Sequence, residues 1–104
     1  MKNFKEMLPV GSVVLLKGGK KKLMVIGIFQ LNEDESKMYD YLGVPYPEGF
    51  IGADRNFLFS HEDITDIVFT GYTNPERENM MEVMQILYDK TLAEHDFLKI
   101  DPET

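Results

Sequence analysis

The first half of the sequence alternates short apolar runs with glycine-rich or polar stretches, a pattern that predicts β-strands joined by tight turns. Residues 12–17 form a nearly continuous apolar run, which is typical of a strand covered on both faces. Gly18 and Gly19 supply the positive φ angles of a tight hairpin, and residues 23–29 predict the returning strand. Within that strand, Gly27 predicts a bulge or a sharp bend.

Three further strands are predicted at residues 38–42, 56–59 and 66–72, each of them short and rich in aromatic or β-branched side chains. Residues 60–63 separate the last two strands. They predict a short helical turn, because Ser60 is a capping residue and Asp63 is an acid three positions later.

A helix is predicted over about residues 75–93, because a capping residue, a proline and an acid follow one another at positions 74–76. Its apolar residues recur at helical spacing and are expected to pack against the strands: Met80, Val83, Met84, Leu87 and Thr91. A second apolar flank makes the stripe wider than one contact requires, and we expect this flank to meet a partner or a second copy: Met81, Tyr88 and Leu92.

These elements predict one domain of the α+β class over residues 1–104, with a β-rich core at 8–72, the helix at 75–93 and a tail at 97–104. Two architectures fit the strand count. One is a small antiparallel SH3-like β-barrel with a C-terminal helix, which the hairpin and the helical turn favour. The other is an open, curved five-stranded sheet with the helix packed across one face.

The segment 40–52 differs from the rest of the chain because it is rich in proline and glycine and also aromatic. Its composition predicts neither a strand nor a helix. Three aromatic side chains in it either cover the end of the sheet or act as recognition residues on a stiff loop: Tyr41, Tyr46 and Phe50. The residues alone leave both interpretations open.

Composition and charge exclude several classes of function. The chain has no cysteine, which removes disulfides, thiolate metal sites and a cysteine nucleophile. Its net charge of −7 would repel nucleic acid over most of the surface. No apolar stretch approaches the roughly 20 residues that span a bilayer, and the N-terminus lacks the pattern of a signal peptide. We therefore expect a cytoplasmic protein that neither binds nucleic acid nor inserts into membranes.

No residue pattern predicts catalysis, a metal site or a cofactor. His61 lies beside Glu62 and Asp63, but neighbouring residues of one turn do not converge on a metal. Residues 33–35 are three consecutive acids without an apolar wall, which is typical of a solvated turn. Residues 18–22 lack the spacing of a phosphate-binding loop. We expect no enzyme activity.

Four segments occur in an order that resembles a known bacterial family. They are residues 8–19 (LPVGSVVLLKGG), 21–27 (KKLMVIG), 39–49 (YDYLGVPYPEG) and 61–64 (HEDI) with 68–72 (VFTGY). Together they are similar to the family catalogued as domain of unknown function 4176. That resemblance implies a small cytosolic protein of Gram-positive bacteria, encoded near type VII secretion systems and their toxins. It implies a role as an adaptor or chaperone and no catalytic residues.

We therefore expect a non-enzymatic module that binds a protein, either a secreted toxin or another accessory factor of secretion. The residues expected to contact it are Tyr41, Tyr46, Phe50, Met81 and Tyr88. The alternative is a small-ligand protein or an enzyme that uses the segment 40–52 as a pocket wall, with His61 or Glu48 as its polar group. A homo-oligomer that buries the second helix flank is also possible from the sequence.

Overall fold

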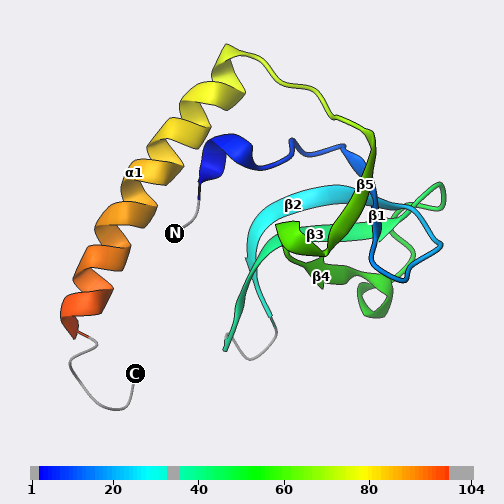
Figure 1. Ribbon diagram of the computed structural model, residues 1–104, viewed down its shortest axis with the longest axis horizontal. Helices are drawn as coiled ribbons and strands as arrows, with labels where there is room; N and C mark the ends of the chain where they lie inside the picture. The colour runs from blue at the N-terminus through cyan, green and yellow to red at the C-terminus, as the bar shows by residue number, and fades with distance from the viewer. Residues whose placement is uncertain (1–2, 33–35, 99–104) are drawn as a thin grey trace. The chain divides into compact units, whose positions relative to one another are not determined.

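The structure, a computed structural model, describes residues 3–32 and 36–98, so the acidic turn predicted at 33–35 lies outside the described residues. The chain divides into two compact units (Figure 1). Residues 7–72 form a sheet unit, and the described part of the second unit comprises residues 3–6 and 73–98. The sheet unit coincides closely with the predicted β-rich core. The chain was predicted as one domain, whereas its backbone contacts group it into these two units.

The sheet unit contains five strands that pair antiparallel in the order β4-β3-β2-β1-β5. Their bounds are Val13–Leu16 (β1), Leu23–Leu31 (β2), Met38–Pro45 (β3), Phe57–Phe59 (β4) and Ile64–Phe69 (β5). The sheet is open, with β4 at one edge and β5 at the other. Of the two predicted architectures, the open five-stranded sheet with a C-terminal helix is therefore the observed one.

The hairpin of β2 and β3 is the longest pairing in the sheet, and the two strands curve together (Figure 1). Its register shifts between Val25, which pairs with Gly43, and Gly27, which pairs with Leu42. This irregularity confirms the bulge predicted at Gly27. A Cβ atom at Gly27 would lie 3.2 Å from the nitrogen at the end of the Gln30 side chain, a tight contact that a small movement of this flexible side chain would relieve.

The strand predicted at residues 38–42 continues three residues further, to Pro45, into the part of the segment 40–52 for which no strand was predicted. Pro45 pairs with Leu23 and is the last residue of the strand, a position where the missing N–H is tolerated. Gly43 does not form a turn. A Cβ atom there would lie 2.9 Å from a ring carbon of Phe59, so glycine permits the close approach of β4 to β3.

The interior of the sheet unit is mainly apolar, and the buried hydroxyl of Ser12 makes two hydrogen bonds within it. Ser12 donates to the carbonyl of Pro9 at 2.7 Å and accepts from the N–H of Gly71 at 2.9 Å. This pair of bonds ties the chain before β1 to the chain after β5. The buried apolar side chains of the unit are Met7, Leu8, Val13, Val14, Leu23, Val25, Tyr41, Val44 and Phe59.

The second unit consists of a short 3-10 helix, η1 (Phe4–Glu6), and a long helix, α1 (Pro75–Leu98). Asn74 caps α1, because its side-chain oxygen accepts the N–H of Arg77 at 2.9 Å. The start of the helix was predicted correctly, and its end lies five residues beyond the predicted one. Phe97 and Leu98 of the predicted tail are helical, and residues 99–104 lie outside the described residues.

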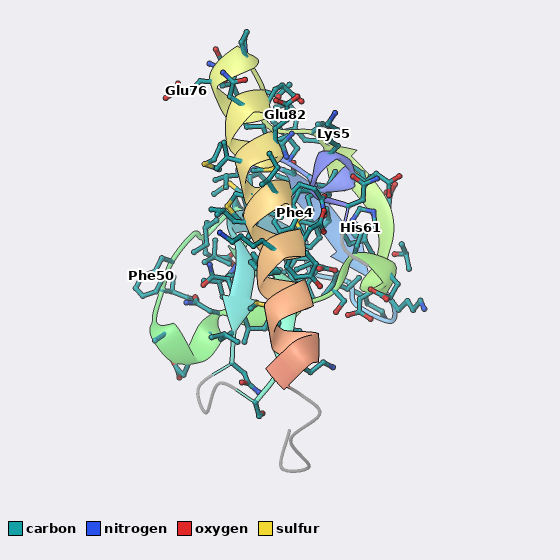
Figure 2. All side chains as sticks on the ribbon, turned by 90° about the vertical axis from the view of Figure 1, so that its left-hand side faces the viewer. Phe4, Lys5, Phe50, His61, Glu76 and Glu82 are labelled. Carbon is teal, nitrogen blue, oxygen red and sulfur yellow. The ribbon has the colours of Figure 1, made fainter. Side chains whose placement is uncertain are left out.

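Residues of η1 pack against one side of α1. The backbone N–H of Phe4 donates to the Gln85 side-chain oxygen at 2.8 Å, and the rings of Phe4 and Tyr88 lie 5.6 Å apart. Lys5 and Glu82 form an ion pair at 4.0 Å on the surface, where both are exposed (Figure 2). Because Phe4 is fully buried, this short segment gives α1 a covered apolar side within its own unit.

Within its own unit, α1 buries a residue of the predicted second flank, because Met81 is only 1% exposed. Met80, Val83 and Leu87 of the first predicted stripe are exposed. Tyr88 is half-buried against Phe4. The cause is the N-terminal segment, to which the sequence assigned no element and which covers the flank that contains Tyr88. The structure describes the side chains of α1 as far as Lys90, and the side chains of Thr91 and Leu92 lie outside that range.

Candidate protein-binding surface

The second half of the segment 40–52 is a loop that two backbone hydrogen bonds hold at the end of β3. The N–H of Tyr46 donates to the carbonyl of Lys22 at 2.9 Å, and the N–H of Gly49 donates to the carbonyl of Pro45 at 2.7 Å. Gly49 adopts a φ of +83°, a conformation that glycine adopts without steric cost. These contacts fix the path of the loop close to the strand that precedes it.

An ion pair joins this loop to the hairpin between β1 and β2. The Lys21 ammonium lies 2.7 Å from one carboxylate oxygen of Glu48 and 2.9 Å from the other. The hydrogen bond from Lys21 lowers the pKa of Glu48 below its ordinary value. Both side chains are exposed, so the pair adds little to stability, but it restricts the loop relative to its neighbour.

Three apolar side chains of the loop face solvent: Tyr46, Phe50 and Ile51. Their exposed fractions lie between 45% and 65%, and Phe50 is the most exposed. Figure 2 shows Phe50 extending outward from the loop. We call these three residues the loop surface. They combine large apolar area with a backbone held by hydrogen bonds, which is the physical profile of a recognition site and not of a loop that covers a core.

Tyr41 is not part of the loop surface, because its ring is fully buried. Its hydroxyl accepts the N–H of Leu8 at 2.9 Å and lies 2.7 Å from Nδ1 of His61. The backbone N–H of His61 in turn donates to the carboxylate of Asp40 at 2.8 Å. These bonds join β3 to the chain before β1 and to the helical turn η3 (His61–Asp63), so the observed role of Tyr41 is structural.

The predicted helical turn is present and capped. Its bounds are those of η3, and the N–H of Ser60 donates to the Asp63 carboxylate at 2.9 Å. His61 therefore occupies the first position of a capped turn, with its ring nitrogen bonded to a buried tyrosine. Asp40 contacts the backbone of His61 and not its imidazole, so the three residues do not form an acid–base relay.

The two polar groups considered for a ligand site are in separate places. Glu48 is paired with Lys21, and His61 is bonded to Tyr41.

A depression of about 560 Å³ lies along β5 and is lined by His61, Glu62, Ile64, Thr65, Asp66 and Ile67. None of these belongs to the segment 40–52, so that segment does not form the wall of this depression. Within residues 3–32 and 36–90, whose side chains the structure describes, no three histidine, aspartate or glutamate side chains gather as a metal site would require.

The structure also has an exposed apolar edge that the sequence did not predict. β5 is an edge strand that pairs with β1, and its side chains Ile67, Val68 and Phe69 are exposed. Nearby in the chain, Tyr72 is 78% exposed. The sequence predicted the strand correctly, but it contained no signal that would place this strand at an edge of the sheet.

The long helix does not have the properties of a membrane span. Over the part of the chain that the structure describes, no helix is both long enough and apolar enough to cross a bilayer.

Comparison with known proteins gave one family. A model described as a domain of unknown function (DUF4176) matches residues 7–80. The match covers the whole sheet unit and the first turns of α1, and it includes every residue of the loop surface. Neither the curated proteins nor the solved structures gave a significant match.

Proposed function

Since the chain belongs to the DUF4176 family, whose description names no activity, we propose a function from its own surface: it is a non-enzymatic module that binds another protein. The observation that supports this proposal is the loop surface of Tyr46, Phe50 and Ile51, which is apolar, exposed and held by backbone hydrogen bonds. Tyr41, Met81 and Tyr88, the other residues expected to bind a partner, are buried or half-buried and are not part of this site.

The physical argument concerns the cost of binding. A partner gains most from large aromatic side chains that lose water completely in the centre of an interface. It loses affinity when the surface must be ordered first, at roughly 0.5–1.5 kcal/mol for each side chain that is immobilised. Tyr46 and Phe50 each have only two side-chain torsions, and their loop is already fixed by contacts to Lys22 and Pro45. Binding at the loop surface would therefore bury large aromatic side chains while little conformational entropy is lost in ordering them.

The kind of partner follows from the family resemblance and is part of the proposal. We infer that the partner is a toxin secreted by a type VII system, or an accessory protein of that system, and that this chain acts on it in the cytoplasm as an adaptor or chaperone. An aromatic surface suits this role, because a substrate awaiting secretion exposes apolar segments that would otherwise aggregate.

The test is co-purification of the full chain with a toxin secreted by a type VII system. The test variant is the double substitution Tyr46→Ala and Phe50→Ala, and the matched control is Tyr72→Ala, which removes an even more exposed aromatic outside the loop. If each loop residue is a hot spot of at least about 2 kcal/mol and the two losses add, the double variant binds at least about 700-fold more weakly. The control retains affinity.

Unchanged affinity of a folded double variant would refute the assignment of the loop, and equal loss in the Tyr72→Ala control would show that the effect is not specific to it. A thermal-shift screen of metabolites and metal ions tests the competing function. A ligand that binds the native state raises the melting temperature, so a reproducible shift would favour the small-ligand alternative.

A further inference from the structure

Helix α1 has a second apolar face that is exposed. Its members are Met80, Val83, Ile86 and Leu87, with exposed fractions between 48% and 65%. At 100° per residue these four positions fall within an arc of about 120°. We call them the helix stripe. The opposite side of α1 contains Met81 and Tyr88 and is the side that receives Phe4.

Within its own unit, η1 covers only one of these two apolar sides of α1. The described surface shows no other group of four apolar side chains on consecutive turns of one element. The exposed residues are branched or long aliphatic side chains, which pack well between two helices in ridges and grooves. The four residues follow one another at intervals of three, three and one positions, which keeps them on one side of the helix, as in a contact between two helices.

The charges at the two ends of the stripe specify what covers it. Glu76 lies four residues before Met80, and Lys90 lies three residues after Leu87, so both fall in line with the stripe. They are exposed and about 21 Å apart along the helix axis at 1.5 Å per residue. Glu76 thus flanks one end of the stripe and Lys90 flanks the other.

A second copy of α1 in antiparallel orientation matches this arrangement at both ends. Each Glu76 then lies beside Lys90 of the partner subunit, and the two-fold symmetry of a homodimer makes the contact twice. A parallel copy would bring glutamate against glutamate and lysine against lysine, which is unfavourable. The polarity of the stripe therefore selects the antiparallel arrangement.

We propose that the chain forms a reversible homodimer in which the helix stripes of two α1 helices pack antiparallel, with the Glu76–Lys90 contact at each end. The contact spans only two to three turns, so its area falls at the low end of specific interfaces and the dimer dissociates on dilution. This surface is separate from the loop surface, and the proposal does not rest on the proposed partner.

The first experiment is analytical ultracentrifugation of the full chain from about 1 µM to about 1 mM, the range in which weak association is detected. The mean mass rises from 12.0 kDa toward twice that value as concentration increases. Val83→Glu, at the centre of the stripe, abolishes the rise and retains the helical circular dichroism. A native chain that remains at 12.0 kDa throughout, or a folded Val83→Glu variant that still dimerises, would overturn the proposal.

Charge reversal tests the contact independently, including the case in which Val83→Glu fails to fold. Glu76→Lys alone or Lys90→Glu alone weakens dimerisation about 10-fold, because each places like charges together at both ends of the stripe. The double substitution restores the native dissociation constant to within about 3-fold. A double variant no better than the single variants would show that these two residues do not meet.

The absence of cysteine allows a direct test of orientation. A disulfide requires Cα atoms within about 7 Å, so two chains with Glu76→Cys do not crosslink to each other when the helices are antiparallel. A mixture of a Glu76→Cys chain and a Lys90→Cys chain does crosslink under mild oxidation. Crosslinking of Glu76→Cys with itself, and not in the mixture, would establish the parallel arrangement and refute the proposal.

Discussion

The Tyr41 hydroxyl offers the sharpest test of how the sheet unit is held together. Substitution by phenylalanine retains the buried ring, whose centroid lies 5.4 Å from that of the Phe59 ring, and removes only the oxygen. That oxygen accepts the N–H of Leu8 in a buried hydrogen bond and also bonds to Nδ1 of His61. The substitution therefore leaves a buried backbone donor without its acceptor.

The two lost bonds differ in cost. A buried donor left unsatisfied costs about 1–3 kcal/mol, because the N–H of Leu8 has lost water and gains nothing in return. The exposed His61 can bond to water instead, so its share is at most about 1 kcal/mol. We expect Tyr41→Phe to destabilise the sheet unit by about 2 kcal/mol and to lower its melting temperature by about 10 °C.

The measurement is urea unfolding of the full chain, followed through the backbone amide resonances of β2 and β3 so that the sheet unit is observed by itself. The matched control is His61→Ala, which removes the other partner of the hydroxyl. Hydrogen exchange at Leu8 supplies a local readout, because its amide loses protection in Tyr41→Phe and retains it in the control. A control that costs as much as Tyr41→Phe, or unchanged protection at Leu8, would refute this reasoning.

Three further predictions follow from single contacts. Met81→Ala lowers the free energy of unfolding by about 2–5 kcal/mol and Met80→Ala by less than about 0.5 kcal/mol, because only Met81 is buried. Equal losses for the two variants in urea unfolding would contradict the assignment of the buried and exposed sides of α1. Lys21→Met raises the pKa of Glu48 toward 4.5, which an NMR titration of the carboxyl group measures. The pKa of Glu48 is depressed in the folded state, so the stability from this pair is present above the unfolded pKa and disappears as pH falls through the folded pKa. If the titration midpoint of Glu48 were the same in Lys21→Met as in the native chain, the contact between the two residues would be excluded. Asn74→Ala removes the helix cap and costs about 1 kcal/mol, whereas Asn74→Asp retains it, and amide exchange in the first turn of α1 distinguishes the two.

Local features of the fold could be predicted from the sequence because their signals lie within a few residues. The bulge at Gly27, the capped turn at His61 and the start of α1 at Asn74 all depend on the residue types found there. The end of β3 was less predictable. Proline and glycine indicate turns in most contexts, and only the pairing with β2 and β4 shows that Gly43 and Pro45 belong to a strand.

Features that depend on distant pairings could not be predicted. The Tyr41 hydroxyl finds its partner at Leu8, 33 positions away, and Phe4 reaches Gln85 across 81 positions. The side of α1 that η1 covers could not be predicted for this reason, since the apolar pattern of α1 has two sides and does not reveal which one meets η1. In the candidate site, the sequence left open whether Tyr46 and Phe50 pack or face solvent, and the structure has both exposed; the burial of Tyr41 depends on its neighbours in the sheet.

The pairing of η1 with α1 has a consequence for how the protein is synthesised and handled. Phe4 is synthesised before the sheet unit, and the helix that covers it is synthesised after that unit. Until then this aromatic side chain has no cover from its own unit and is available to chaperones. For the same reason, a bulky group attached next to Phe4 would affect α1 around Gln85, 81 positions away, before it affected any strand.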